Sequence, residues 1–266
     1  MQTGKLLAID GLNIVRRIYE AHQEDDLQAK AEAALTHALA SLRRVAAAHK
    51  PTHLVAAFDA GGHTWRHDLY PAYRAHRAPM PDALRDALPA FYERLREAGM
   101  AVLSVPGVEA DDVIATAVVR WLAEGRGEAV VASNDKDLHC LIAHGALLWD
   151  SFKNESHDRD WVLHKFGVPP ELLPELLALA GDSADGIPGV EKVGVKTAAK
   201  LLQAYGSLEQ VMAGAGILKG SLGERLRRDR EQLAMSRQLV ALKTDVTLGV
   251  TWNTLLYGVG LGPGHA

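Results

Sequence analysis

The chain has 266 residues, of which 48% are hydrophobic and 23% charged, and its formal net charge is −4. This length accommodates one large domain, or one domain with a smaller appendage. No run of about 18 apolar residues is present, so we expect no membrane span, and the first residues lack the pattern of a signal peptide. The single cysteine, Cys140, lies in the apolar run LHCLI, which is typical of a buried thiol in a reducing compartment, and we expect a cytoplasmic protein.

Short apolar runs alternate with helical patterns over residues 5–150. The runs that predict strands are KLLAI, HLVAAF, MAVLSV, EAVVAS and ALLWD. The segments that predict helices are 25–49, 82–98, 111–124 and 135–143. This alternation predicts an α/β core over residues 1–160, with a mostly parallel sheet and helices on both faces.

The segment 60–81, AGGHTWRHDLYPAYRAHRAPMP, interrupts this alternation. It has glycine and proline at both ends and basic and aromatic residues inside. A long irregular segment in a compact domain is usually functional or disordered.

The pattern becomes mostly helical after residue 160. A helix, a glycine-punctuated hairpin and a second helix are predicted within PPELLPELLALAGDSADGIPGVEKVGVKTAAKLLQAYGS. Residues 220–242 predict one further basic helix. We therefore assign residues 161–250 to a helical lobe and residues 251–266 to a C-terminal tail.

Acidic residues gather where the predicted strands end. Nine of them follow a strand or precede the hairpin: Asp10, Asp59, Glu109, Asp111, Asp112, Asp135, Asp137, Asp182 and Asp185. Ligands of open α/β sheets bind beyond the carboxyl ends of the strands, so these side chains are expected to share one edge.

Each of these acids alone is adequately explained as a helix cap or a turn residue. Nine together would repel one another strongly unless cations neutralised them. Oxygen ligands without a histidine or cysteine pattern favour Mg²⁺ or Mn²⁺, and two such ions are a known solution for phosphodiester hydrolysis. Without the nine, 24 acidic residues face 29 lysines and arginines, a net charge of +5, which suits a polyanionic substrate.

Four ordered motifs resemble the 5′-nuclease superfamily, which includes the 5′→3′ exonuclease domain of bacterial DNA polymerase I and standalone flap endonucleases. They are FDAGGHTWRHDLYPAYRAHR, GVEADDVIATA, SNDKDLHCLI and GDSADGIPGVEKVGVKTAAKLL. The likeness spans residues 5–245 and implies a PIN-like core, a helical arch at about residues 60–100 and a helix-hairpin-helix lobe. It also implies two Mg²⁺ ions, replaceable by Mn²⁺. The first would be held by Asp10, Asp59, Glu109 and Asp111, with Asp112 close by. The second would lie among Asp135, Asp137, Asp182 and Asp185.

The resemblance also assigns roles to the arch. Arg74 and Arg77, three residues apart, would lie on one helix face and stabilise charge on the scissile phosphate. Arg74 departs from the lysine usual in the family, and an arginine fork binds phosphate differently from a lysine point charge. Tyr73 would stack on a base near the cleavage point. Arg66, His63, His67 and His76 would at most contact backbone phosphates. The sequence contains no second cluster of zinc ligands that would complement these histidines, so we do not expect a histidine zinc site.

The hairpin motif is expected to grip duplex DNA without reading its sequence. The contacting residues would be Lys192, Val193, Gly194, Val195, Lys196 and Thr197. Lys192 stands where relatives usually have glycine, so the turn is either strained or gains a phosphate contact. In the family this element often holds K⁺, here through the backbone carbonyls of Leu179, Ala180, Pro188, Val190 and Val193. Further basic residues either extend the duplex footprint or form a solvated helix face: Lys219, Arg225, Arg227, Arg228 and Arg230.

These observations predict a monomeric, structure-specific 5′ nuclease that removes 5′ flaps and degrades 5′ ends of DNA by a two-metal mechanism. One alternative is a weakly active or inactive accessory protein that binds DNA junctions. Another is an RNA-directed nuclease with a related acidic cluster. The complete set of nine acids favours catalysis, and the basic arch and hairpin favour DNA.

Overall fold

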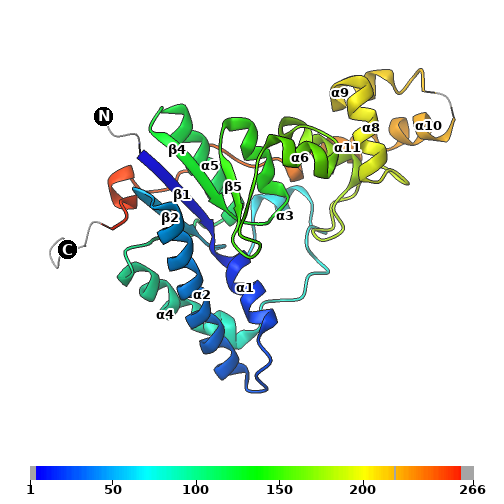
Figure 1. Cartoon of the computed structure of the whole chain (residues 1–266). Coiled ribbons are helices and arrows are strands. Elements are labelled where there is room, and N and C mark those ends of the chain that lie inside the picture. The colour runs from blue at the N-terminus through cyan, green and yellow to red at the C-terminus, as the bar shows by residue number, and fades with distance from the viewer. Residues whose placement is uncertain (1–3, 219, 259–266) are drawn as a thin grey trace.

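A six-stranded sheet forms the centre of the computed structural model, which describes residues 4–218 and 220–258 (Figure 1). The strand order is β3-β2-β1-β4-β5-β6, and only the pairing of β5 with β6 is antiparallel. The strands are β1 (Gly4–Asp10), β2 (His53–Ala57), β3 (Ala101–Leu103), β4 (Gly127–Ala132), β5 (Leu147–Asp150) and β6 (Glu155–His157). The five predicted strands are confirmed. The sixth has only three residues, ESH, at the edge of the sheet, and so it lacks the apolar run that marks the others.

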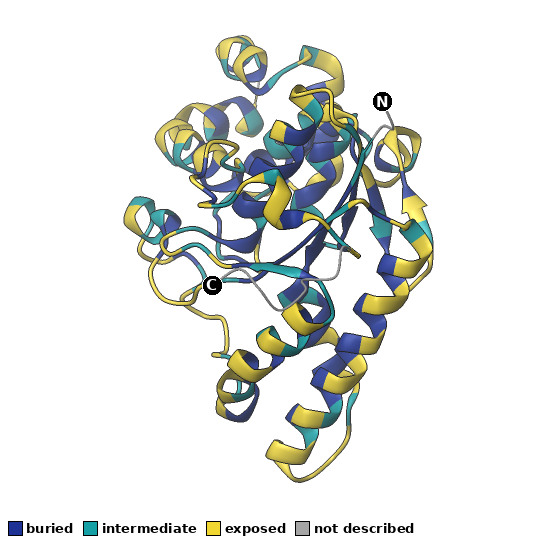
Figure 2. Cartoon of the chain, turned by 90° about the vertical axis from the view of Figure 1, so that its left-hand side faces the viewer, coloured by how far each residue is buried: buried dark blue, intermediate teal, exposed yellow. Residues whose placement is uncertain are grey.

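Alternate residues of the central strands face two hydrophobic cores. Leu7 and Ile9 of β1 pack into one core, and Leu6 and Ala8 pack into the other. The first core is covered by α1 (Gly11–Ala21), α2 (Leu27–His49) and α4 (Asp82–Glu97). The second is covered by α5 (Ala110–Ala123) and the 3₁₀ helix η1 (Asp137–His144). Buried residues accordingly follow the strands and the inward faces of the helices in Figure 2, which confirms the α/β class.

The remaining helices build a third core beyond the sheet edge. They are α6 (Arg159–Phe166), η2 (Pro170–Leu172), α7 (Leu173–Ala180), α8 (Val195–Tyr205), α9 (Leu208–Gly214), α10 (Ser221–Arg228) and α11 (Arg230–Val240). The prediction of one helix over 220–242 is wrong, because the chain leaves helical geometry at Asp229, where α10 ends and α11 begins. Lys219 lies outside the described residues.

The helical arch expected at about residues 60–100 is irregular over most of its first half. Only α3 (Trp65–Leu69) is helical between residues 60 and 81, and α4 packs against α2. Proline cannot continue a helix and disfavours helical geometry in the residue before it, and Pro71, Pro79 and Pro81 divide this segment. Arg74 and Arg77 therefore lie in consecutive turns rather than on one helix face.

Residues 241–257 do not form a loose tail. They return from the third core to the sheet, where Val246, Leu248 and Leu255 join the second core. The 3₁₀ helix η3 (Trp252–Leu255) lies in this segment, and the Tyr257 N–H donates to the Thr52 carbonyl at 2.9 Å beside β2. The tail predicted over 251–266 is thus packed up to residue 257, and its last eight residues lie outside the described chain. Between residues 4 and 258, the described helices include none with the length and hydrophobicity of a membrane span.

Candidate metal centre

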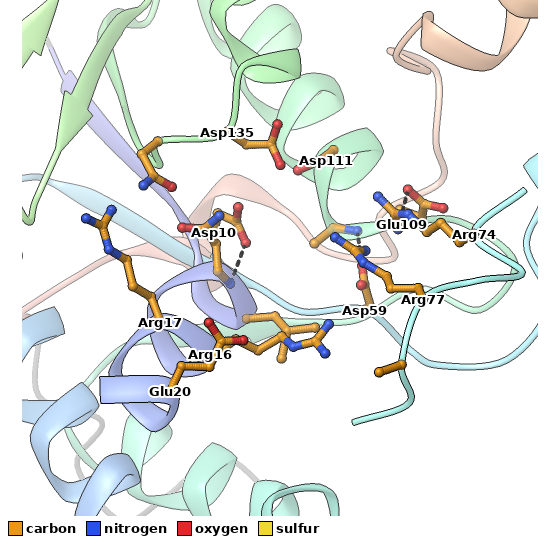
Figure 3. Close-up of a pocket in the computed structure, with 15 residues that line it drawn as sticks. Asp10, Arg16, Arg17, Glu20, Asp59, Arg74, Arg77, Glu109, Asp111 and Asp135 are labelled. Carbon is orange, nitrogen blue, oxygen red and sulfur yellow. Dashed lines mark hydrogen bonds and ion pairs between the residues drawn. The ribbon is translucent and has the colours of Figure 1, made fainter. Parts of the chain in front are cut away.

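The carboxyl ends of β1, β2 and β4 and the start of α5 surround an open cavity of about 620 Å³. Its lining includes Asp10, Asp59, Glu109, Asp111 and Asp135, as the strand-end rule predicts. Figure 3 shows these five carboxylates facing the cavity, with Arg16 and Arg17 of α1 on one side and Arg74 and Arg77 on the other.

Asp10 is fixed by contacts that leave it buried. Its side chain caps α1 by accepting from the Asn13 N–H at 3.1 Å, and it accepts from the Ser133 hydroxyl at 3.0 Å. Burial, with the charge of Asp135 adding to it, raises the pKa of Asp10 to about 7. Burial and the charges of Asp135 and Asp10 likewise raise the pKa of Asp111 well above its ordinary value. Carboxylates held so close without compensating charge are suited to a cation.

A second carboxylate group lies beside the first. One oxygen each from Asp137, Asp182 and Asp185 lie within 4.8 Å of one another. The buried Oδ1 of Asp137 has no hydrogen-bond partner among the described residues, and burial together with the Asp135 charge raises the Asp137 pKa to about 7. Lys136 reaches only part of this group, through a 2.7 Å contact with Asp182. An orphaned buried oxygen within an all-oxygen donor set fits a hard divalent cation.

Arg74 and Tyr73 join the two groups. The Arg74 guanidinium donates to both oxygens of Asp185 at 2.8 and 2.9 Å and lies 3.1 Å from Glu109. The Tyr73 hydroxyl is 3.1 Å from each of the same two carboxylates. Burial raises the pKa of Asp185, but the hydrogen bonds and charge of Arg74 outweigh it and leave that pKa below its ordinary value.

The predicted stacking of Tyr73 on a base does not fit this structure. Its side chain is 2% exposed, because the ring is packed among the C-terminal helices and its hydroxyl is used by the two carboxylates. Arg77 differs from its neighbours. Its side chain is 43% exposed, and its nearest carboxylate contact, to Asp185, is 4.0 Å long, so its guanidinium is accessible from the cavity.

Asp112 and Arg66 belong to the protein interior rather than to the metal and DNA surfaces. Asp112 is fully buried and receives two parallel hydrogen bonds from Arg66 at 2.8 and 3.0 Å. It also accepts from the Trp65 indole and the Lys243 N–H, while Arg66 donates to the carbonyls of residues 239 and 241. Asp112 is fully buried and, unlike the other acids, belongs neither to the cavity lining nor to the second carboxylate group, and Arg66, which is 3% exposed, does not reach a DNA phosphate.

Several residues of the site were not identified from the sequence. Ser133 links two predicted ligands, because it donates to Asp10 and accepts from the Asp135 N–H at 3.0 Å. Its place two residues before Asp135 in SNDKD is a local signal that could have identified it. Arg16 and Arg17 line the cavity from α1, a helix absent from the sequence prediction.

The hairpin before α8 brings two backbone segments into close contact. A Cβ on Gly189 would lie 2.3 Å from the Gly181 nitrogen. Lys192 adopts a left-handed φ of 60°, which most side chains disfavour. Lys192, Gly194, Val195 and Lys196 are exposed.

Val193 is less accessible than expected for a DNA contact. Its side chain is buried, and its N–H donates to the Val190 carbonyl. Of the carbonyls assigned to K⁺, that of Leu179 accepts from the Val190 N–H and that of Pro188 from the Ser236 hydroxyl.

Comparison with known proteins identifies both parts of the chain. Residues 5–167 match the family of 5′-3′ exonuclease N-terminal resolvase-like domains, and residues 168–259 match the 5′-3′ exonuclease C-terminal SAM fold. Flap endonuclease Xni of Psychromonas ingrahamii is 34% identical over 257 residues, covering 95% of this chain and 97% of the relative. The enzyme of the same name from Pseudoalteromonas translucida is 36% identical over 256 residues, covering 94% and 97%.

Solved structures show the same fold. The T5 5′-exonuclease with bound zinc ions superimposes with a TM-score of 0.73 at 20% identity, covering 90% of each chain. The catalytic core of Rad2 in complex with DNA gives a TM-score of 0.57 at 15% identity, covering 96% of this chain and 83% of that one. With both parts of the sequence matched and its relatives aligned over almost their full length, the chain belongs to the 5′-3′ exonuclease family.

Proposed function

We propose that this protein is a structure-specific 5′ nuclease that hydrolyses DNA phosphodiesters at 5′ flaps and 5′ ends. The observation that carries the proposal is a cavity lined by five of the predicted carboxylates and flanked by arginines, beside a second group of three carboxylates. Membership of the 5′-3′ exonuclease family and full-length relatives named flap endonuclease support it.

Divalent cations, Mg²⁺ or Mn²⁺, are the proposed cofactors. Asp10, Asp59, Glu109 and Asp111 would hold one, and Asp135, Asp137, Asp182 and Asp185 the other. When bound, the two ions would lower the pKa of a water nucleophile and stabilise the leaving oxygen.

The protein's own groups orient the substrate around that centre. Arg77 is accessible and would bind the scissile phosphate, while Arg74 keeps Glu109 and Asp185 in place. Gly194, Val195 and Lys196, at the exposed start of α8, present N–H groups that suit a phosphate of the duplex. K⁺ at the adjacent hairpin carbonyls would add to that grip. These contacts do not depend on the base sequence, and DNA binding is expected to weaken steeply as the salt concentration rises.

The proposal is tested with a 5′-labelled flap substrate and a nicked duplex, incubated with Mg²⁺, Mn²⁺ or EDTA. The wild type is compared with Asp135→Ala, and Asp25→Ala, an exposed acid between α1 and α2 that does not line the cavity, is the matched control. We expect metal-dependent cleavage near the flap base by the wild type and the control. Asp135→Ala should lose it while still binding the flap.

Flap binding without cleavage in either metal would contradict the nuclease and favour a junction-binding accessory protein. Cleavage of RNA but not DNA would contradict the substrate assignment. Undiminished cleavage by Asp135→Ala would contradict the assigned centre.

A further inference from the structure

Three buried or half-buried polar side chains form a hydrogen-bonded line behind the carboxylates. Glu155 Oε1 lies 2.9 Å from His157 Nε2, His157 Nδ1 lies 2.9 Å from His139 Nε2, and His139 Nδ1 lies 2.8 Å from the backbone oxygen of Asp135. Both imidazoles are 2% exposed. The line therefore runs from the protein surface, through β6 and η1, to the back of a proposed metal ligand.

Aromatic packing fixes the orientation of both imidazoles. The Trp161 ring of α6 stacks on His157 at 3.6 Å between centroids, with 11° between planes, and on His139 at 5.1 Å. Phe166 closes the edge of the stack, 6.0 Å from His139. Rings clamped in this way cannot turn without unpacking α6 from the core.

The hydrogen bond to Asp135 has a fixed direction. A backbone carbonyl only accepts, so His139 donates from Nδ1 and its Nε2 accepts from the Nδ1–H of His157. His157 thereby holds His139 in the tautomer that can donate to the carbonyl. The Glu155 carboxylate only accepts, so the remaining nitrogen of His157, Nε2, donates to it, and His157 is a donor at both nitrogens.

The peptide held in this way connects two proposed ligands. The Asp135 N–H is fixed by Ser133, and the Asp137 N–H donates to the Asp135 carboxylate at 3.0 Å. Between them, the Asp135–Lys136 peptide sets the direction of both aspartates and of Lys136, which contacts Asp182. Rotation of this peptide would move several groups of the centre at once.

We propose that His139 is a positioning residue for divalent-cation binding, held in place by His157, Glu155 and Trp161. It fixes the Asp135–Lys136 peptide so that Asp135 and Asp137 stay aligned with the other carboxylates. This inference rests on the proposed metal centre, so it is tested by binding of the metal itself, without DNA and without cleavage.

The test compares His139→Phe, which keeps a ring in the stack but loses both hydrogen bonds, with His139→Asn, whose amide can still donate to the Asp135 carbonyl. Mn²⁺ binding is measured by electron paramagnetic resonance on folded protein, and His144→Phe on the same 3₁₀ helix is the control. Loss of a group that orients a metal ligand typically costs 10–100-fold in metal affinity. We expect about a 10-fold weaker Mn²⁺ affinity in His139→Phe, recovery to within about threefold in His139→Asn, and no change in the control.

A flap-cleavage assay adds a second reading of the same variants. The Mg²⁺ concentration for half-maximal cleavage should rise in His139→Phe in parallel with the Mn²⁺ affinity, while flap binding in EDTA stays within about twofold of the wild type. A purely structural role would lower the Tm and leave the metal dependence unchanged. Wild-type Mn²⁺ affinity in His139→Phe, or no recovery in His139→Asn, would overturn the proposal.

If His139→Phe does not fold, Glu155→Ala tests the surface end of the line, because this side chain is 43% exposed. We expect about a two- to threefold loss of Mn²⁺ affinity, and an unchanged affinity overturns the proposal. Absence of Mn²⁺ binding in the wild type would contradict the metal centre itself. Mn²⁺ binding without cleavage would contradict the nuclease and leave the positioning result to be judged on affinity alone.

Discussion

Arg74 holds the two carboxylate groups together through one planar guanidinium, although its own backbone is in the left-handed region at φ 53°. Its removal leaves Glu109 and Asp185 without their main counter-charge. Loss of a group that orients a metal ligand typically reduces metal affinity or activity 10–100-fold. We expect a loss of this size in flap cleavage by Arg74→Ala, measured under single-turnover conditions.

Arg74→Lys keeps the charge but not the fork, and its cleavage rate should lie between those of the wild type and Arg74→Ala. Flap affinity in EDTA should change by less than about fivefold in both, because Arg74 is mostly buried. A wild-type cleavage rate in Arg74→Ala would contradict this role of Arg74 and would show that Arg77 is sufficient for flap cleavage without it.

The buried pair of Arg66 and Asp112 makes a different prediction, which concerns stability. Arg66→Met would leave the fully buried Asp112 carboxylate without its cation, and breaking a buried pair typically costs 3–5 kcal/mol. We expect the free energy of unfolding in urea to fall by about that amount. The double variant Arg66→Met/Asp112→Leu should recover most of the loss, and equal unfolding free energies for the wild type and Arg66→Met would contradict the assignment.

These residues show how far the sequence could define the site. The structure places five of the nine acids on one cavity and three more in a second carboxylate group: Asp10, Asp59 and Asp135 follow the parallel strands β1, β2 and β4, whereas Asp182 and Asp185 lie in the segment after α7. Asp112 could not be separated from Asp111, because its partner Arg66 is 46 positions away and the two meet only after folding. Tyr73 was likewise expected at the surface, because its burial against the third core depends on helices more than 90 positions later.

At the scale of elements, the hairpin before α8 contains a lysine where its geometry favours glycine. A non-glycine residue in the left-handed region destabilises the fold by about 1–2 kcal/mol. Glycine avoids this cost, but it loses more conformational entropy on folding, which cancels part of the gain. Lys192→Gly should therefore raise the free energy of unfolding by about 0.5–1 kcal/mol. It should also weaken duplex binding about two- to threefold at low salt, because one phosphate-directed charge is lost.

Lys50, at the end of α2, is the matched control because it too has a left-handed φ, of 46°. Lys50→Gly should give a similar gain in stability by urea unfolding with no change in duplex affinity. Equal effects of the two variants on duplex binding would contradict a DNA contact at Lys192.

Elements were predictable where local pattern and packing agree. The central strands are apolar because helices cover both faces of the sheet, so each strand is recognisable in the sequence as one short apolar run. The arch was expected as a helix from family resemblance, but three prolines prevent that helix here. The break between α10 and α11 at Asp229 was not predicted, because the sequence has the pattern of a charged helix on both sides of it.

At the scale of the whole molecule, proton binding at the acidic centre opposes cation binding. Burial, followed by the Asp135 charge, raises the pKa of Asp10 and Asp137 from 3.8 to about 7. Between about pH 4 and pH 7 the folded, ion-free protein holds protons that the unfolded chain has released, so these two groups make the fold less stable as pH rises. Cation binding requires both carboxylates ionised.

The rise in Tm produced by saturating Mg²⁺ should therefore be larger at about pH 8 than at about pH 5.5, by about 3–5 °C. Differential scanning fluorimetry at the two pH values measures it. Asp137→Asn should reduce both the Mg²⁺ effect and its pH dependence. An identical Mg²⁺ shift at both pH values in the wild type would contradict competition between protons and cations.

The return of residues 241–257 to the sheet has a consequence for the order in which the molecule is made. The carbonyls of Leu239 and Ala241, and the Lys243 N–H, complete the Arg66–Asp112 pair at the start of α5. During synthesis the N-terminal strands, the acids and α5 all leave the ribosome before these groups do. A nascent chain that has reached only residue 238 lacks these three groups, so the hydrogen bonds of Arg66 and Asp112 that support the start of α5 are complete only after residue 243 has been added.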